Sequence, residues 1–462
     1  MEPSFEPRSR VVAPHVAPLA RYFTGHFSLR SLGLAARAVG PVRTPADAGR
    51  PAGATSRLLL PLGGDGPLMQ TVILAAGEGT RMRPLTETVP KPMLPVADRP
   101  LCAHAADAAV AAGAGELVLV VGYEAAAVRG YFGDSYRGVP VSYAVQEEQL
   151  GTAHAVEQAT EYLDGPFVVL NGDDLYDEAA VAALFDGGPA VGAHAVDDPR
   201  PYGVLSLDGD RVVDIVEKPD DPPSDRVNIG AYRFPAEAAD WVADVDLSAR
   251  GEYEITDVVD RLVAEREVQA VPVERWLGAG RPWELLEANE WKLGELDRRI
   301  DGEVRGNAEL RGTVVVEAGA TVEPGVVIEG PALVRSGAEV GPNAYVRGAT
   351  HVGEDCEVGH GVEVKNSVLM AGAAVPHVSY VGDSLLGPDV NLGAGTQVAN
   401  LRHDDAAVEQ TVKDDRVSTG RRKYGVVAGP GAKTGVNTSL APGVVLSAGA
   451  TTDPGESVMR DR

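Results

Sequence analysis

A glycine-rich stretch followed by cations, residues 71–95, carries the clearest sign of chemistry in this sequence. The apolar run Val72–Leu74 leads into two alanines and then into the segment Gly77–Thr80, which reads GEGT. Glycines allow consecutive backbone N–H groups to turn toward the oxygens of a phosphate group. Because Arg81 and Lys91 follow within reach of the same anion, the stretch predicts a phosphate cradle. The alternative is an ordinary turn between a strand and a helix.

Polar residues elsewhere in the chain could also carry chemistry. Asp173 ends a buried apolar run, where an acid is badly placed for a core but well placed for a hard cation that bridges phosphates. Arg347 and Lys365 could clamp a phosphate together, or could be two solvated charges. His377 is the residue type that acts as a general base near neutral pH, although a lone histidine is more often structural.

Alternating apolar runs and helical patterns must position the first group of residues. Between Met69 and about Arg299 we expect strands at Thr71–Leu74, Glu116–Val121, Val141–Val145, Phe167–Leu170 and Asn228–Phe234. Helices are expected at Cys102–Ala112, Ala125–Tyr131, Ala153–Ala159, Ile255–Glu265 and Trp283–Leu296. This alternation predicts a mostly parallel, Rossmann-like α/β sheet, with ligands at the carboxyl ends of its strands.

A six-residue period positions the second group. Apolar residues recur at every sixth position from Val304 to Met370, slip around His377, and resume after an interruption at 401–423. This period is typical of a parallel β-helix with one flat face per six residues. We expect most of these residues only to stack the coil, and function to lie where the period breaks.

Stacking in such a coil brings residues from successive turns together. Arg347 and Lys365 are eighteen residues apart, which is three six-residue segments and one full turn. Both side chains are therefore expected on the same edge of the coil.

The charge and cysteine content restrict the partners and the compartment. The net charge is −26, which argues against nucleic acid or an anionic membrane as a partner. Lysine is scarce beside arginine, which suggests the salt-adapted cytosol of a halophilic microbe or simply an acidic soluble protein. Cys102 and Cys356 fall in different expected domains, so a reducing, cytoplasmic location fits. No apolar run reaches the length of a membrane span.

Residues 1–68 differ in composition from the rest of the chain. They are rich in proline, alanine and arginine and poor in acids, and their short apolar pieces do not form a signal peptide. We expect a disordered leader, a transit peptide, or an untranslated segment ahead of a start at Met69. The expected domains are then 69–299 and 300–458.

The first domain resembles the sugar-1-phosphate nucleotidyltransferases, whose signature LxxGxGTRxxPLTxxxPKPxLP matches residues 74–95 closely. The resemblance implies that Arg81 and Lys91 act catalytically on the phosphates and that Asp173 binds Mg²⁺. It also implies a nucleotide site and a sugar site. The nucleotide site would contain Leu74, Ala76, Gly77, Gln146, Gly151 and Thr152, with Gln146 reading the base. The sugar site would contain Gly203, Glu217 and Asn228.

One departure from that family concerns the metal. Many relatives carry a second metal-binding acid in a segment like WLDxG, whereas Trp276–Gly280 reads WLGAG here. Gly278 then replaces a carboxylate, which is expected to weaken Mg²⁺ binding. Glu274 and Asp174 are the candidates to substitute for it.

The second domain resembles the acetyltransferase half of bifunctional N-acetylglucosamine-1-phosphate uridylyltransferase/glucosamine-1-phosphate acetyltransferase. The matching pieces lie between Ala344 and Asn400. By resemblance, a left-handed β-helix binds acetyl-CoA between the chains of a homotrimer, and His377 is the general base. The other implied contacts are Arg347, Lys365, Tyr380 and Asn391 for the sugar phosphate, Asn400 where the sugar meets acetyl-CoA, and Lys423 on phosphate or CoA. His403, in an archaeal-like insertion, is a further polar candidate.

Three interpretations follow. The favoured one is synthesis of UDP-N-acetylglucosamine from glucosamine 1-phosphate, acetyl-CoA and UTP. The second is a glucose-1-phosphate uridylyl- or thymidylyltransferase with a mainly structural β-helix. The third is a regulatory subunit whose first site is inactive, as Gly278 would allow.

Overall fold

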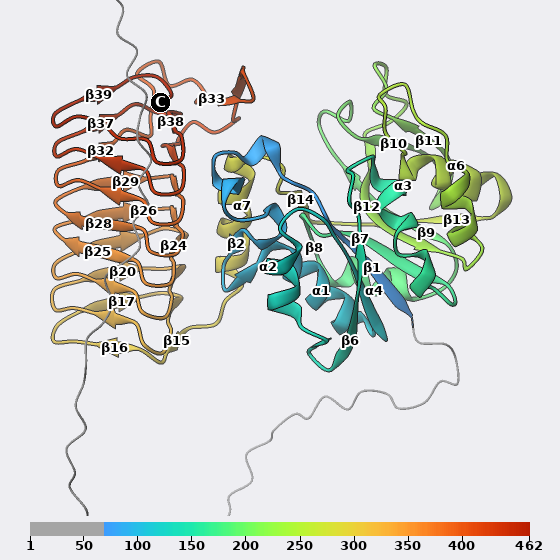
Figure 1. Ribbon diagram of the computed structural model, residues 1–462, viewed down its shortest axis with the longest axis horizontal. Coiled ribbons are helices and arrows are strands. Elements are labelled where there is room, and N and C mark those ends of the chain that lie inside the picture. The colour runs from blue at the N-terminus through green and yellow to red at the C-terminus, as the bar shows by residue number, and fades with distance from the viewer. Residues whose placement is uncertain (1–68) are drawn as a thin grey trace, which may run out of the picture. The chain divides into compact units, whose positions relative to one another are not determined.

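The computed structural model describes residues 69–462 (Figure 1). The expectations for residues 1–68 lie outside the described residues. The described chain forms a ten-stranded sheet with helices, followed by a coil of short parallel strands. Within it, no helix combines the length and apolar character needed to cross a membrane.

One half of the large sheet is parallel, as predicted. Strand β1 (Gln70–Ala75) lies between β4 (Glu116–Val121) and β7 (Phe167–Asn171), and β4 also pairs with β6 (Val139–Val145). A short edge strand, β5 (Ser135–Tyr136), pairs antiparallel to β6. All four expected strands of this half are confirmed to within two residues. Their carboxyl ends carry the glycine loop and Asp173.

The other half of the sheet is mixed, so the prediction of a mostly parallel sheet is wrong there. Strand β12 (Arg226–Phe234) runs antiparallel to both β7 and β9 (Ala190–Ala195). Strands β10 (Gly203–Asp208) and β11 (Arg211–Glu217) form a hairpin, and β13 (Val268–Pro272) pairs with β9 and β11. The two-residue link in the hairpin permits only antiparallel pairing.

Helices cover the large sheet. The five expected helices are confirmed as α1 (Leu101–Ala112), α2 (Ala125–Phe132), α3 (Thr152–Glu157), α6 (Ile255–Glu265) and α7 (Pro282–Gly294). Helices α4 (Glu178–Phe185) and α5 (Ala238–Trp241) were not expected. Neighbouring residues of β1 enter different cores, since Val72 belongs to one buried cluster and Ile73 to another. The strand is therefore buried on both faces, as a central strand requires.

The coil has three parallel sheets, and the chain visits them in turn (Figure 1). The first contains β15 (Arg299–Ile300), β18 (Val314–Val316), β21 (Ala332–Val334), β24 (Thr350–Val352), β27 (Val368–Leu369), β30 (Leu385–Leu386), β35 (Val427–Ala428) and β38 (Val445–Leu446). The second contains β16 (Glu303–Val304), β19 (Thr321–Val322), β22 (Glu339–Val340), β25 (Glu357–His360), β28 (Ala374–His377), β31 (Asn391–Leu392) and β36 (Lys433–Thr434). The third contains β17 (Glu309–Arg311), β20 (Val327–Glu329), β23 (Tyr345–Arg347), β26 (Glu363–Lys365), β29 (Tyr380–Gly382), β32 (Gln397–Val398), β37 (Ser439–Leu440) and β39 (Ser457–Val458).

The six-residue period builds this coil as expected. Its apolar residues, such as Val340, Val346 and Val352, form one continuous buried cluster inside the coil. Arg347 pairs with Lys365 between β23 and β26, so the two cations do stack one turn apart. The polar segment at 401–423 contains a hairpin of β33 (Glu409–Val412) and β34 (Asp415–Ser418).

The period slips at two places that lie on either side of His377, rather than at His377 itself. His377 is in step with His360 one turn earlier. The interior passes from Val364 to Leu369, one residue sooner than the period requires, while Met370 faces a different buried cluster. This first shortening lies at the corner Asn366–Ser367, where Asn366 takes a left-handed conformation with φ 46°. The corner turns tightly there because the Ser367 hydroxyl donates to the Lys365 carbonyl at 2.8 Å. A second shortening falls between Val381 and Leu386, where Asp383 has a φ of 52°.

Candidate active sites

The glycine loop after β1 is shaped by its contact with Lys91. Gly79 has a φ of 67°, and a Cβ at this position would lie only 2.7 Å from the Cβ of Lys91. A larger residue is therefore excluded by both conformation and space. Gly77 is exposed with open space around it, so the loop remains accessible from solvent.

Gln149, which the sequence analysis did not single out, fixes the start of this loop. Its side-chain amide donates to the Ala76 carbonyl at 2.8 Å, and its carbonyl oxygen accepts from the backbone N–H of Glu78 at 3.4 Å. Leu74 is engaged differently, because its carbonyl accepts from the N–H of Gly172 at 2.9 Å. Backbone groups of β1 and the loop are thus hydrogen-bonded to two other segments, the side chain of Gln149 and the backbone of Gly172.

Lys91 and Asp173 form an ion pair at the carboxyl end of β7. Lys91 is only 6% exposed, so its ammonium group is held in one place. Burial opposes ionisation of Asp173, but the attraction and hydrogen bond of Lys91 outweigh it and lower the pKa of Asp173. The pair brings two predicted site residues together from distant parts of the chain.

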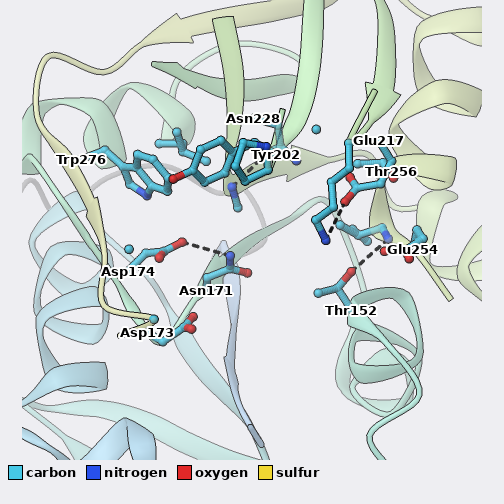
Figure 2. Close-up of a pocket in the computed structure, with 18 of the residues that line it drawn as sticks. Thr152, Asn171, Asp173, Asp174, Tyr202, Glu217, Asn228, Glu254, Thr256 and Trp276 are labelled. Carbon is cyan, nitrogen blue, oxygen red and sulfur yellow. Dashed lines mark hydrogen bonds and ion pairs between the residues drawn. The ribbon is translucent and has the colours of Figure 1, made fainter. Parts of the chain in front are cut away.

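A cavity of about 370 Å³ opens beside this pair. Asp173 and Asp174 lie on one side of it, and the sugar-site residues Glu217 and Asn228 lie on another (Figure 2). Arg81 and Gly203 also line the cavity. A cation and carboxylates at one end, with amide and carboxylate groups at the other, suit a ligand that is both phosphorylated and rich in hydroxyl groups.

The predicted sugar residues meet through the pairing of β10, β11 and β12. Gly203 pairs directly with Glu217, and a Cβ on Gly203 would come within 3.0 Å of the Glu217 carboxylate. Asn228 donates to the Tyr232 hydroxyl at 2.7 Å and accepts from the N–H of Gly230 at 3.0 Å. These polar groups are therefore already oriented at the cavity wall.

The segment 146–152 is arranged in a way that sequence alone did not reveal. Gln146 is buried and donates to the Gly151 carbonyl at 3.1 Å. Gly151 has a φ of 121°, and a Cβ there would lie 2.4 Å from the Tyr253 carbonyl oxygen. The approach of Tyr253 by itself requires a glycine here, and the predicted contact of Gly151 with the nucleobase stays a prediction. Thr152 lines the cavity and accepts from the N–H of Ile255 at 3.1 Å.

Asp174 lies opposite Gly278 in a small ladder of β8 (Asp174–Tyr176) and β14 (Trp276–Gly278). Burial, together with the negative charge of Asp173, raises the pKa of Asp174 well above its usual value. Glu274, the other candidate to replace the missing carboxylate, is exposed and does not line the cavity. Two carboxylates beside a phosphate site are the donors that a hard cation takes in proteins, so these residues fit Mg²⁺.

A second group of predicted residues lies on the third sheet of the coil. Arg347 forms an ion pair with Glu363 at 2.7 Å, and Lys365 pairs with the buried Asp383 at 2.7 Å. Asn400 donates to the Tyr380 hydroxyl at 3.1 Å, and its amide also contacts Asp383. Asp383 thus holds two predicted site residues, Lys365 and Asn400, although sequence reasoning gave it no role of its own.

The general-base candidate lies around a corner from these cations. His377 ends β28 on the second sheet, and its side chain is exposed. Among residues 69–462 no hydrogen bond engages its imidazole. Asn391 is also exposed on the second sheet, while Lys423 and His403 are exposed near the 401–423 segment. A single chain therefore does not gather His377 with Arg347 and Lys365.

Comparison with known proteins finds matches to both the α/β sheet and the coil. A family model described as nucleotidyl transferase matches residues 70–293, and one described as the GMPPB C-terminal domain matches residues 328–424. The "Bifunctional protein GlmU" of Methanococcus vannielii is 38% identical over 81% of this chain and 91% of its own length. The chain belongs to the GlmU family of bifunctional enzymes.

Two further relatives show the same extent of likeness. The "Bifunctional protein GlmU" of Methanocaldococcus jannaschii is 37% identical over 85% of this chain and 95% of its own length. A "Bifunctional sugar-1-phosphate nucleotidylyltransferase/acetyltransferase" from Sulfurisphaera tokodaii is 34% identical over 85% of this chain and 98% of its own length. The likeness to the GlmU family therefore spans the α/β sheet and the coil together.

Proposed function

We propose that this chain makes UDP-N-acetylglucosamine in two steps. Acetyl-CoA first acetylates the amine of glucosamine 1-phosphate, and UTP then transfers its uridylyl group to the resulting sugar phosphate with release of pyrophosphate. The observation that carries the proposal is that one chain, related over most of its length to bifunctional enzymes, holds a phosphate-type cavity and stacked cations on a coil.

The cavity beside β1 and β7 supports the nucleotidyl transfer. A sugar-phosphate oxygen attacks the α-phosphorus of UTP, and the bond to the pyrophosphate oxygen breaks. Both reactants are anions, so charge neutralisation and alignment provide most of the catalysis. Arg81, which lines the cavity, would hold the triphosphate, and Lys91, which pairs with Asp173, would contact the transferred phosphate. A Mg²⁺ ion bound at Asp173 would screen the remaining phosphate charge.

The coil supports the acetyl transfer. The amine of the sugar attacks the thioester carbonyl, His377 removes the amine proton, and the CoA thiolate leaves. Arg347 and Lys365 would hold the sugar phosphate, because two cations one turn apart match a phosphate group. Tyr380 and Asn391 would contact the sugar, and Asn400 and Lys423 the acetyl-CoA.

The position of His377 supports a site completed between copies of the chain. His377 lies on a different sheet from Arg347 and Lys365, and its imidazole is free of hydrogen bonds within the described residues. The proposal therefore includes a homotrimer of left-handed β-helices, in which the cations of one copy face the His377 of the next. It also includes domains at 69–299 and 300–458 and a cytoplasmic location, with which the two free buried cysteines agree.

The proposal is tested with one purified sample in high salt. Thiol release from acetyl-CoA is measured with glucosamine 1-phosphate, galactosamine 1-phosphate and glucose 1-phosphate. Pyrophosphate release from UTP is measured with the same sugars and their N-acetylated forms. We expect thiol release with glucosamine 1-phosphate and pyrophosphate release with N-acetylglucosamine 1-phosphate. Pyrophosphate with glucose 1-phosphate and no thiol release would favour the simpler transferase, and no pyrophosphate with any nucleotide would favour a regulatory role.

A further inference from the structure

Gly278 stands where many relatives carry an acid, and the side chain of Asp174 reaches into the space beside it. Gly278 and Asp174 are directly opposite partners in the antiparallel ladder of β8 and β14. A Cβ built on Gly278 would lie 2.9 Å from Oδ1 of Asp174, closer than real Cβ atoms come to another atom. An aspartate at 278 and the present orientation of Asp174 therefore exclude one another. The carboxylate of residue 174 thus reaches the place where a side chain at 278 would begin.

Asp174 is also held so that its carboxylate stays at the cavity. The Asn171 amide donates to its Oδ2 at 3.0 Å (Figure 2). Asn171 is fixed in turn, because a Cβ on Gly230 would overlap its amide nitrogen at 1.9 Å. Gly230 has a φ of 70° and makes this close approach possible. The orientation of Asp174 is thus determined by packing over three segments.

Asp174 forms no ion pair of its own within the described chain. Lys91 pairs with Asp173, whereas no ion pair within residues 69–462 includes Asp174. Asp174 is only 6% exposed, and a buried carboxylate without a cation is costly. A bound divalent cation would remove that cost.

We propose that Asp174 is the second carboxylate for the divalent cation of nucleotidyl transfer, together with Asp173, in place of an acid at position 278. The inference rests on the proposed function for its biological role, but not for its test. No group of three acidic, histidine or cysteine side chains within residues 69–462 is placed to hold a metal. The remaining ligands are therefore phosphate oxygens and water, as is common for Mg²⁺.

Moving the carboxylate from residue 174 to residue 278, its partner in the ladder, gives a direct test. Mn²⁺ binding is followed by electron paramagnetic resonance on the full chain without sugar or nucleotide, in wild type, Asp174→Ala, Gly278→Asp and the double variant. Asp174→Ala is expected to weaken Mn²⁺ binding at least tenfold, because one of two carboxylates is lost. The double variant is expected to recover most of that loss, since Gly278 has no left-handed φ and the space of residue 174 is empty. Gly278→Asp alone is expected not to bind more tightly than wild type.

Controls separate the ligand role from a structural one. Glu254→Gln removes another carboxylate from the cavity wall and is expected to leave Mn²⁺ affinity within twofold. If Asp174→Ala does not fold, Asp174→Asn keeps the shape and the acceptor for Asn171, and its Mn²⁺ affinity decides. Wild-type affinity in a folded Asp174 variant, or a double variant no better than Asp174→Ala, would overturn the proposal.

This result is independent of the proposed function. Absence of turnover with UTP and N-acetylglucosamine 1-phosphate would reject that function while Mn²⁺ binding still followed Asp174. Normal turnover, together with a Mn²⁺ affinity that is unchanged in the Asp174 variants, would reject only the present inference.

Discussion

The cavity of the α/β sheet and the cation stack of the coil are built by different means. In the cavity, Lys91 and Asp173 are 82 positions apart in the chain and meet in a buried ion pair. In the coil, Arg347 and Lys365 are neighbours because the strand register repeats, and both reach solvent. A sheet edge gathers its residues within one chain, whereas a repetitive coil spreads them over flat faces. On the proposed function, we therefore expect the first site to be complete in one copy and the second to need a neighbouring copy.

The largest effect that would sharpen this comparison is expected from His377→Ala. Loss of a general base lowers the rate by roughly 10²–10⁴-fold, so thiol release should nearly vanish while pyrophosphate release is unchanged. His360→Ala is a matched control, because His360 occupies the same face one turn earlier and is also exposed. Equal loss in both variants would remove His377 from its assigned role.

Lys91→Ala should have the opposite selectivity. It removes the rigid cation at the cavity and leaves Asp173 unpaired, so pyrophosphate release should fall about 10²–10³-fold. Thiol release should remain at the wild-type level, since the coil does not use this residue. Lys433→Ala, at an exposed lysine of the coil, controls for loss of positive charge. A parallel fall of both reactions would mean that the two sites are not independent.

Burial of His351 in the coil is expected to make the free energy of unfolding depend on pH. Burial, with the positive charge of Arg335 nearby, lowers the pKa of His351 to about 3. The unfolded imidazole takes up a proton near pH 6.5, so the unfolded state binds more protons and stability falls as the pH drops below that value. From pH 7 to pH 4.5 this contribution is about 2–3 kcal/mol.

Denaturant unfolding at the two pH values measures this contribution. His351→Gln should lose less stability on acidification than wild type. An identical pH dependence in both proteins would contradict the assignment of the effect to this histidine.

Arg347→Ala should have the smallest effect. Removing one of two cations that hold a phosphate should raise the KM for the amino sugar phosphate about tenfold, with less change in kcat. Arg311→Ala is the matched control, because Arg311 lies two turns earlier on the same sheet. A change in kcat alone would place Arg347 in the chemical step.

The sequence predicted the parts of the fold that depend on local periodicity. The strand Glu116–Val121 and the helix Ile255–Glu265 have the predicted bounds, because hydrophobic spacing alone defines them. The interior of the coil followed in the same way from its six-residue period. The antiparallel half of the sheet was missed, since its strand order depends on contacts between distant segments.

Side-chain roles were harder to predict than strands. Asp383 was missed because a charge that follows a coil strand gives no sign that it will be buried by Lys365 and Asn400. The reason for Gly151 was missed because Tyr253, which approaches it, is 102 positions later in the sequence. Both cases depend on tertiary contacts that no local pattern reports.

Complementation between inactive copies tests the central claim most directly. Differently tagged His377→Ala and Arg347→Ala chains are co-expressed, and mixed oligomers are assayed for thiol release at a sugar phosphate concentration well below KM, where Arg347→Ala alone should keep only about a tenth of the wild-type rate. Since each coil site would take its histidine and its arginine from different copies, about a quarter of wild-type activity should return. A mixture of Lys91→Ala and Asp173→Asn chains should regain no pyrophosphate release. No recovery of thiol release in the first mixture, or recovery of pyrophosphate release in the second, would contradict the account.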